Sequence, residues 1–353
     1  MPVKHAQPNL SQSQVCELMK RLYNLTAAEM RPLPSYDDQN LYVAPCEGGE
    51  FVLKIMNSEH SKNITIIEVQ THAMSFLHQN GLPVQTAVPT ASGQLMSLEE
   101  MGMKGADPSA FITASIINRR ISSRASGIDQ LAGKKDFVRW QMEHPHLSIL
   151  ERENFIWSLS NVSLLKGYLN VLDGDPLQEA VKSVITQYED YVIPKRPNFR
   201  KCINHGDFND LNVLVQPDDN HGYKISGILD FGDMNSGYYV FELAITIMYM
   251  MIEHPDPIQV GGPVLAGWES VFPLNQDEKD CLYLLVLSRF CQSLVMARYS
   301  VTLHPENEEY LMITSRKGVK ILQRFWELGK KHVEKVWFQH AAEFNKTMNK
   351  DVN

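Results

Sequence analysis

The chain has 353 residues, of which 44% are hydrophobic and 21% are charged, as in ordinary soluble proteins large enough for two domains. A formal net charge of −8 disfavours nucleic acid and anionic membrane surfaces as main partners, and it suits a cationic small substrate. The five cysteines lack metal-ligand spacing, and the N-terminal residues lack a secretion signal. We therefore expect a cytoplasmic protein, and its longest apolar run, residues 243–252, is too short to span a bilayer.

Two amphipathic helices and at least one strand are predicted in the first hundred residues. Apolar spacing predicts helices over residues 11–23 and 64–80. Between them, residues 51–55 (FVLKI) have the composition of a strand, and the alternation places Lys54 on the face opposite Leu53 and Ile55.

Residues 99–146 interrupt this regular pattern. The stretch is rich in small, polar and basic residues. Residues 111–117 could form a short strand or a turn of helix, and residues 136–142 could form another helical turn. A structureless segment of this length is unusual inside a compact domain.

The remainder of the chain is predicted to be mainly helical. Amphipathic or apolar spacing predicts helices over residues 177–191, 243–252, 276–300 and 306–345. The second of these is apolar on all sides, which indicates a buried helix.

A pair of short apolar runs carries the polar residues of most interest. Residues 212–215 (NVLV) and 225–231 (ISGILDF) flank a turn-forming segment, residues 217–222, and together they predict a β-hairpin. His-Gly-Asp at residues 205–207 precedes the first strand, and Asp230 lies at the end of the second. The hairpin would bring these two polar ends together.

The spacing of Asp207, Asn212 and Asp230 is typical of phosphoryl transfer. Asp207 can accept a proton from a hydroxyl, while Asn212 (212 − 207 = 5 residues later) and Asp230 offer the oxygen ligands that Mg²⁺ prefers. Protein kinases use a catalytic-loop Asp, an Asn five residues on and the Asp of Asp-Phe-Gly in the same order. The alternative is an acidic hairpin whose Asp side chains only cap turns.

The motif His-Gly-Asp, in place of the His-Arg-Asp of protein kinases, resembles the aminoglycoside phosphotransferase and choline kinase-like family. Longer stretches resemble the hydroxylysine kinases of that family; they are residues 31–40, 152–157, 228–234, 238–252, 259–262 and 288–295. The resemblance implies an α+β, protein-kinase-like two-lobed fold. It has a small antiparallel β-lobe with one helix, a mainly helical large lobe, and the nucleotide in the cleft between them.

The resemblance also implies roles for residues of the small lobe. Lys54 would contact the nucleotide phosphates, and Glu68 in the following helix would hold Lys54 in place. Ser35 and Asn40 lie in a segment that resembles the loop covering the nucleotide. Each role has a plain alternative, namely an outward-facing lysine, an exposed helix glutamate and a surface turn.

Two further residues are expected to support the catalytic loop. His205 would hold the loop by packing and hydrogen bonding, and Glu242 would bind backbone N–H groups of the loop. Acidic contacts to the substrate's amino groups could come from Asp210, Asp233 or Glu253.

The predicted organisation has four parts. Residues 1–19 form a tail and helix start, residues 20–98 a nucleotide-binding lobe, and residues 147–353 a helical catalytic lobe. Residues 99–146 replace the strand and helix that kinases place between the lobes. They represent a divergent insertion, a splice variant or a gene-model error.

The predicted function is that of a small-molecule kinase. By resemblance, it transfers the γ-phosphoryl group of GTP, or ATP, to the hydroxyl of 5-hydroxylysine in lysine catabolism, with Mg²⁺ as cofactor. Choline, homoserine or an aminoglycoside are alternative acceptors. A non-catalytic kinase-like variant or scaffold is the alternative from another class, because residues 99–146 depart from the family.

Overall fold

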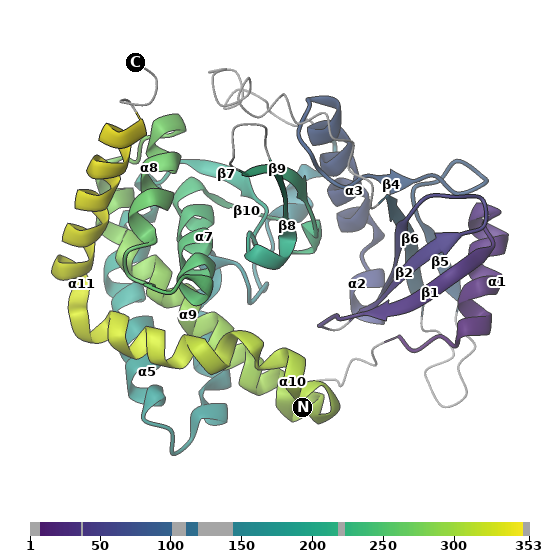
Figure 1. Cartoon of the computed structure of the whole chain (residues 1–353). Helices are drawn as coiled ribbons and strands as arrows, with labels where there is room; N and C mark the ends of the chain where they lie inside the picture. The colour runs from purple at the N-terminus through teal and green to yellow at the C-terminus, as the bar shows by residue number, and fades with distance from the viewer. Residues whose placement is uncertain (1–7, 37, 101–110, 119–143, 218–222, 349–353) are drawn as a thin grey trace. The chain divides into compact units, whose positions relative to one another are not determined.

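The computed structural model describes residues 8–36, 38–100, 111–118, 144–217 and 223–348 (Figure 1). The chain divides into two compact units. The sheet unit comprises residues 1–149 and 213–230, and the helical unit comprises residues 150–212 and 231–353. The predicted hairpin therefore belongs to the sheet unit, although it lies far along the sequence from the rest of that unit.

The sheet unit is built on a six-stranded antiparallel sheet. Its strands are β1 (Ala27–Leu33), β2 (Gln39–Pro45), β3 (Phe51–Met56), β4 (Ala87–Val88), β5 (Ser97–Glu100) and β6 (Phe111–Asn118). The order is β1-β2-β3-β6-β4, and β5 pairs with β6. The helices of this unit are α1 (Gln12–Tyr23), α2 (Ser58–Ser61) and α3 (Ile64–Gln79).

Helix α1 covers one face of this sheet. Its apolar side chains pack with those of β2 and β3 in a single core cluster, to which Met19, Leu53 and Ile55 contribute fully buried side chains. Burial of each such side chain stabilises the fold by about 1.5–3 kcal/mol. Leu53 and Ile55 are buried while Lys54 is not, which confirms the predicted alternation along β3.

Of the two forms that residues 111–117 could take, a short strand or a turn of helix, the structure contains the strand. Residues 111–118 form β6, which pairs with the whole of β3 and also with β4 and β5. The sequence left both forms open, because a short apolar run does not distinguish a strand from a helical turn. The segment 99–146 is therefore not irregular throughout. Residues 101–110 and 119–143, including the helical turn expected at 136–142, lie outside the described residues.

The predicted hairpin is confirmed as β8 (Val213–Pro217) and β9 (Tyr223–Ile228), which pair antiparallel. Ile228 joins this hairpin to the rest of the sheet unit. Its N–H donates to the carbonyl of Pro83 (2.7 Å), and its carbonyl accepts from the N–H of Gln85 (3.2 Å).

The helical unit contains the remaining elements. Its long helices are α5 (Leu177–Gln187), α7 (Tyr239–Glu253), α8 (Gly261–Val271), α9 (Gln276–Leu303) and α11 (Ile313–Met348). Shorter helices and turns are η3 (Leu147–Leu150, at the boundary), η4 (Leu159–Leu172), η5 (Tyr188–Val192), α6 (Ile193–Lys195), η6 (Arg196–Asn198), η7 (Asp210–Asn212), η8 (Phe231–Asp233), η9 (Pro305–Asn307) and α10 (Glu308–Leu311). Strands β7 (Lys201–Asn204) and β10 (Asn235–Tyr238) pair antiparallel.

Helix α9 forms the centre of the helical unit, where it contacts α5, α7, α11 and η4. Figure 1 shows α7 and α11 beside it. By length and composition α9 could cross a membrane, but 94% of its most apolar window is buried within the protein. Such burial is typical of the core helix of a folded domain. Helix α11 is kinked at Gly329, whose φ of 72° breaks the helix into two segments.

Candidate active site

The catalytic loop of the motif begins where β7 ends, and its glycine is required by the backbone. Gly206 has a φ of +88°, a conformation that L side chains rarely adopt. A Cβ atom at this position would lie 2.4 Å from the carbonyl oxygen of Asp233 and 2.9 Å from Nδ2 of Asn235. The Gly of His-Gly-Asp therefore lets the loop pass against the Asp-Phe-Gly turn without a clash.

Three N–H donors fix the carboxylate of Asp207. Its Oδ2 accepts from the side-chain amides of Asn209 (2.8 Å) and Asn212 (3.1 Å), and its Oδ1 accepts from Nη2 of Arg289 (3.0 Å). Asn212 also donates to the Asp207 carbonyl (3.0 Å). Because the amide nitrogen of Asn212 is used in this way, its Oδ1 is the atom left to act as a ligand.

The turn η7 is held by a residue inside the motif. The side-chain oxygen of Asn209 accepts from the backbone N–H groups of Leu211 (2.9 Å) and Asn212 (3.0 Å). This local side-chain-to-backbone pattern is typical of Asn in tight turns. Asn209 thus links the turn geometry to the orientation of Asp207.

The supporting roles expected for His205 and Glu242 are confirmed. His205 accepts a hydrogen bond from the N–H of Asp207 (3.3 Å), and its ring packs edge-on against Phe231 at 4.9 Å between centroids. Glu242 accepts from the N–H of Gly206 (3.2 Å). These contacts join the catalytic loop to the Asp-Phe-Gly turn and to helix α7.

Arg289 is a residue of this site that the sequence analysis did not identify. Its side chain is only 1% exposed, and it contacts the Asp207 carboxylate from helix α9. Burial alone would lower the pKa of Arg289, but Tyr249, Asp207 and Asp233 outweigh it and raise that pKa above its ordinary value. The signal was available, because Arg289 is the sole charged residue between Asp280 and Arg298 in an otherwise apolar stretch.

The stretch 152–157, which carries part of the family resemblance, and the adjoining Ser158 are bonded to both α9 and the Asp-Phe-Gly turn. Arg152 donates to the carbonyls of Gly232 (3.1 Å) and Met234 (3.3 Å). The amide of Gln292 in α9 donates to the carbonyls of Ile156 (2.7 Å) and Ser158 (3.0 Å). Segments that are distant in sequence are therefore joined by hydrogen bonds within the helical unit.

In the sheet unit, Lys54 pairs with two carboxylates. Its Nζ lies 3.0 Å from Oδ1 of Asp230 and 3.6 Å from Oδ2 of Asp38. Asp38 is buried, and its Oδ1 accepts from the backbone N–H of Asn57 (2.8 Å). Burial alone would raise the pKa of Asp38, but hydrogen bonding and charge from His60 and Lys54 lower it below its ordinary value.

The expected pairing of Lys54 with Glu68 is not found in the structure. Glu68 is exposed on the outer face of α3, between the buried residues Ile67 and Val69. Among the ion pairs of the described residues, Lys54 has Asp38 and Asp230 as its partners. The helical phase of α3 explains the difference, because it turns position 68 away from the core.

The loop predicted to cover the nucleotide does connect the first two strands. Ser35 is half-buried in the segment between β1 and β2, and Asn40 lies within β2. The register of β2 and β3 places Asn40 directly opposite Lys54. The Oδ1 atom of Asn40 is buried without a hydrogen-bond partner in the part of the chain that the structure describes. Asn40 therefore offers a free acceptor beside Lys54.

Asn212 directly precedes the first strand of the β8–β9 hairpin, and Asp230 follows its second strand. Asn212 immediately precedes Val213, which pairs with Ile228, and Asp230 follows two residues after Ile228. Asp230 has a φ of 55°, a strained value for a residue other than glycine. The described residues contain no group of three or more His, Cys, Asp or Glu side chains that could hold a metal ion. Taken singly, the carboxylate of Asp230 and the amide oxygen of Asn212 are each a kind of ligand that Mg²⁺ accepts, beside phosphate and water.

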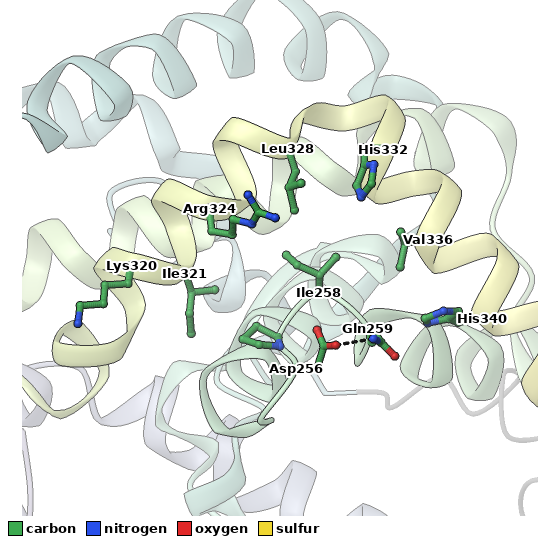
Figure 2. Close-up of a pocket in the computed structure, with 11 residues that line it drawn as sticks. Asp256, Ile258, Gln259, Lys320, Ile321, Arg324, Leu328, His332, Val336 and His340 are labelled. Atoms are coloured by element: carbon green, nitrogen blue, oxygen red, sulfur yellow. Dashed lines mark hydrogen bonds between the residues drawn. The ribbon is translucent and has the colours of Figure 1, made fainter.

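A separate pocket of about 510 Å³ lies in the helical unit, between the segment 256–259 and helix α11. Figure 2 shows Lys320, Arg324, His332 and His340 of α11 around it, and a hydrogen bond from Gln259 to Asp256. The pocket is lined by none of the predicted site residues. We therefore do not assign it to phosphoryl transfer.

Comparison with known proteins shows what the whole chain resembles. Residues 143–278 match the profile of the phosphotransferase enzyme family. An amicoumacin kinase in complex with AMP-PNP and Ca²⁺ superposes with a TM-score of 0.61 at 14% identity, covering 91% of this chain and 98% of that one. A microcompartment-associated aminopropanol kinase has the same TM-score and identity, over 90% of this chain and 98% of that one.

The family profile, together with the relative described next, identifies the chain as a small-molecule kinase, a phosphotransferase that acts on an alcohol group. A hydroxylysine kinase of Danio rerio is 59% identical over 353 aligned residues, which cover 98% of this chain and 99% of that protein. The chain belongs to the hydroxylysine kinase family.

Proposed function

We propose that this kinase transfers the γ-phosphoryl group of GTP, or ATP, to the hydroxyl of 5-hydroxylysine. The observation that carries the proposal is the 59% identity to a hydroxylysine kinase over nearly the whole of both chains. The net charge of −8 also suits an acceptor with two amino groups.

In the proposed reaction, Asp207 is the general base. The acceptor oxygen attacks the γ-phosphorus, its proton passes to the Asp207 carboxylate, and the bond from the γ-phosphorus to the bridging oxygen breaks to release a nucleoside diphosphate. The carboxylate is 26% exposed, so a hydroxyl can reach it, while its three N–H contacts hold it in one orientation. A positioned base of this kind contributes about 10²–10⁴-fold to the rate.

Asn212 and Asp230 would hold Mg²⁺, which when bound spreads the charge of the transferring phosphoryl group. Lys54 would leave its carboxylate partners to contact the nucleotide phosphates, and Ser35 and Asn40 would contact the nucleotide from the β1–β2 segment. We extend this proposal with one change from the family pattern, in which Asp38 takes the place of Glu68 as the partner of Lys54.

Asp210 is the residue that we propose to receive an amino group of the substrate. It lies three residues after Asp207 (210 − 207 = 3) in η7. Asp210 is exposed, but partial loss of water around its carboxylate, together with the charges of Glu253 and Asp207, raises its pKa. When the pKa of a carboxylate is raised, an ammonium group that binds beside it stabilises the ionised form.

The non-catalytic alternative rested on residues 99–146. Residues 111–118 of this segment form strand β6, and its first two residues, 99 and 100, end the strand β5 that pairs with β6. In addition, the 353 aligned residues cover 98% of this chain, which leaves little room for a long segment without a counterpart in the relative. These observations favour catalysis, and no second function is proposed.

The test is release of nucleoside diphosphate by the purified chain with Mg²⁺ and either GTP or ATP, with and without 5-hydroxylysine. We expect release that requires 5-hydroxylysine and that falls by about 10²–10⁴-fold in Asp207→Asn. Choline, homoserine and an aminoglycoside serve as competing acceptors. Equal release with choline would reassign the acceptor, and no release from a folded protein whose melting temperature does not respond to nucleotide would restore the non-catalytic alternative.

A further inference from the structure

We propose that Arg289 is a positioning residue, which fixes the carboxylate of Asp207 in the orientation needed to take a proton from the acceptor hydroxyl. The inference rests on the proposed function, in which Asp207 is the base. Nη2 of Arg289 donates to Oδ1 of Asp207 at 3.0 Å. Charge-assisted hydrogen bonds of this kind are among the strongest that side chains form.

Stability alone does not account for an arginine at this place. The side chain is 1% exposed, while its carboxylate partner is 26% exposed. Removing a guanidinium from water is costly, and replacing a buried ion pair with packed apolar residues is often neutral or stabilising. The buried cation therefore points to a task at its partly exposed partner.

The guanidinium is itself held firmly by the core of the helical unit. Its Nη1 donates to the carbonyl of Trp157 (2.9 Å), and its Nη2 donates to the hydroxyl of Tyr249 (3.1 Å). It also lies over the rings of these two residues, at 5.1 Å from the Trp157 centroid and 5.4 Å from that of Tyr249. Such cation–π contacts strengthen when they are desolvated. The position of Oδ1 in Asp207 is thus set by groups that belong to the core.

The second oxygen of the carboxylate is fixed from the other side. Oδ2 accepts from Asn209 and Asn212, so three N–H groups occupy positions around a carboxylate that offers about four. The Tyr249 hydroxyl also hydrogen-bonds this carboxylate, which is still 26% exposed and therefore accessible to the acceptor hydroxyl. A displacement of about 1 Å at a reacting group can reduce a rate by about 10²-fold, which is the loss expected if one side of this arrangement is removed.

The experiment compares Arg289→Lys with Arg298→Lys in the full-length chain. Arg298 lies on the same helix and pairs with Asp175 at 2.9 Å, away from Asp207, so it is the matched control. We expect Arg289→Lys to lower kcat by about 10- to 10²-fold with the KM for nucleotide changed by less than about twofold. Arg298→Lys should change neither value.

A double-mutant cycle separates positioning from a general structural role. When Asp207→Asn has removed the base, Arg289→Lys should cause little further loss of kcat, because the group that it orients is gone. Equal fractional losses in both backgrounds, or wild-type kcat in a folded Arg289→Lys protein, would overturn the inference. If Arg289→Lys does not fold, Tyr249→Phe removes one anchor of the guanidinium, and the same cycle is run with that variant. A wild-type chain without acceptor-dependent turnover would contradict the proposed function, and the inference would fall with it.

Discussion

Asp207 in the helical unit and Asp230 in the sheet unit are both carboxylates of the candidate site, but the protein surrounds them differently. Asp207 accepts hydrogen bonds from Asn209, Asn212 and the fully buried Arg289. Asp230 is 48% exposed and pairs with the terminal ammonium of Lys54, a flexible side chain. Core packing thus fixes the first carboxylate, whereas an exchangeable ion pair holds the second.

This difference matches the two kinds of work proposed for them. A general base must be oriented before the acceptor arrives, because its contribution depends on geometry. A metal ligand must instead change partners, since the carboxylate of Asp230 would give up Lys54 for Mg²⁺ while Lys54 moves to phosphate. The comparison therefore predicts that substitutions of the groups that hold Asp207 act on orientation, and that those at Asp230 and Lys54 act on metal and nucleotide binding.

The largest effect in the sheet unit is expected from Asp230→Asn, which keeps the size of the side chain and removes its charge. Turnover should fall by on the order of 10²-fold or more, because stabilisation of phosphoryl charge by a metal is worth several kcal/mol. Titration of turnover against Mg²⁺ concentration provides the measurement, with the exposed Asp256→Asn as control. A Mg²⁺ dependence identical to that of wild type would remove Asp230 from the metal site.

Gly206→Ala tests the backbone that carries Asp207, and Gly48→Ala is its matched control. Both glycines have positive φ, +88° and +92°, but a Cβ at Gly48 would meet no atom within 4 Å. Gly48→Ala should cost about 1–2 kcal/mol from φ alone. Gly206→Ala should cost more and should also lower turnover, because the loop must move away from Asp233. Urea unfolding measures both, and equal losses would show that the close contact does not matter.

The partner of Lys54 is tested by comparing Asp38→Asn with Glu68→Gln. We expect Asp38→Asn to reduce kcat/KM for the nucleotide by about tenfold, a loss equal to about 1.4 kcal/mol, because Lys54 loses a buried carboxylate neighbour. Glu68→Gln should stay within about twofold of wild type, since Glu68 is exposed. The opposite ranking would restore the pairing that the sequence pattern suggested.

The smallest effect is expected from Asp210→Asn, and it depends on pH. The pKa of Asp210 is higher in the folded protein than in the unfolded chain. Ionisation of Asp210 therefore destabilises the folded state. This destabilisation begins as the pH rises above the unfolded pKa and is complete above the folded pKa. The variant should therefore melt slightly higher than wild type at pH 7, with a difference that shrinks as the pH falls toward 4. Its KM for 5-hydroxylysine should rise. A lower melting temperature at pH 7 would contradict the assignment.

Local patterns in the sequence predicted much of this architecture. Periodicity located α1, α3, β3 and the β8–β9 hairpin, because each has an apolar face whose spacing is visible in the sequence. The Gly and Asp of the catalytic motif were likewise identified from spacing. In these cases the chemistry requires particular residue types at fixed separations, so the residues can be identified from their order in the sequence.

Contacts between distant segments could not be predicted in this way. Arg289 lies 82 residues from Asp207 and Asp38 lies 16 residues from Lys54 (54 − 38 = 16), and neither separation belongs to a recurring motif. The sequence left a strand and a turn of helix open at residues 111–117, and the pairing of β6 with β3, a contact between distant segments, decides for the strand. Glu68 points outward because of the way α3 packs, and this packing cannot be predicted from the sequence of α3 alone.

Residues 213–230 belong to the sheet unit but follow part of the helical unit in the sequence, and this order has a consequence for biosynthesis. A ribosome that has made residues 1–149 has not yet supplied the hairpin, and it must add the segment 150–212 of the helical unit first. The bonds between Ile228 and the backbone at Pro83 and Gln85 therefore close late, after about two-thirds of the chain has emerged. Neither unit can be obtained whole by a single truncation, and a nascent chain shorter than 223 residues lacks Asp230 as well as the second strand of the hairpin.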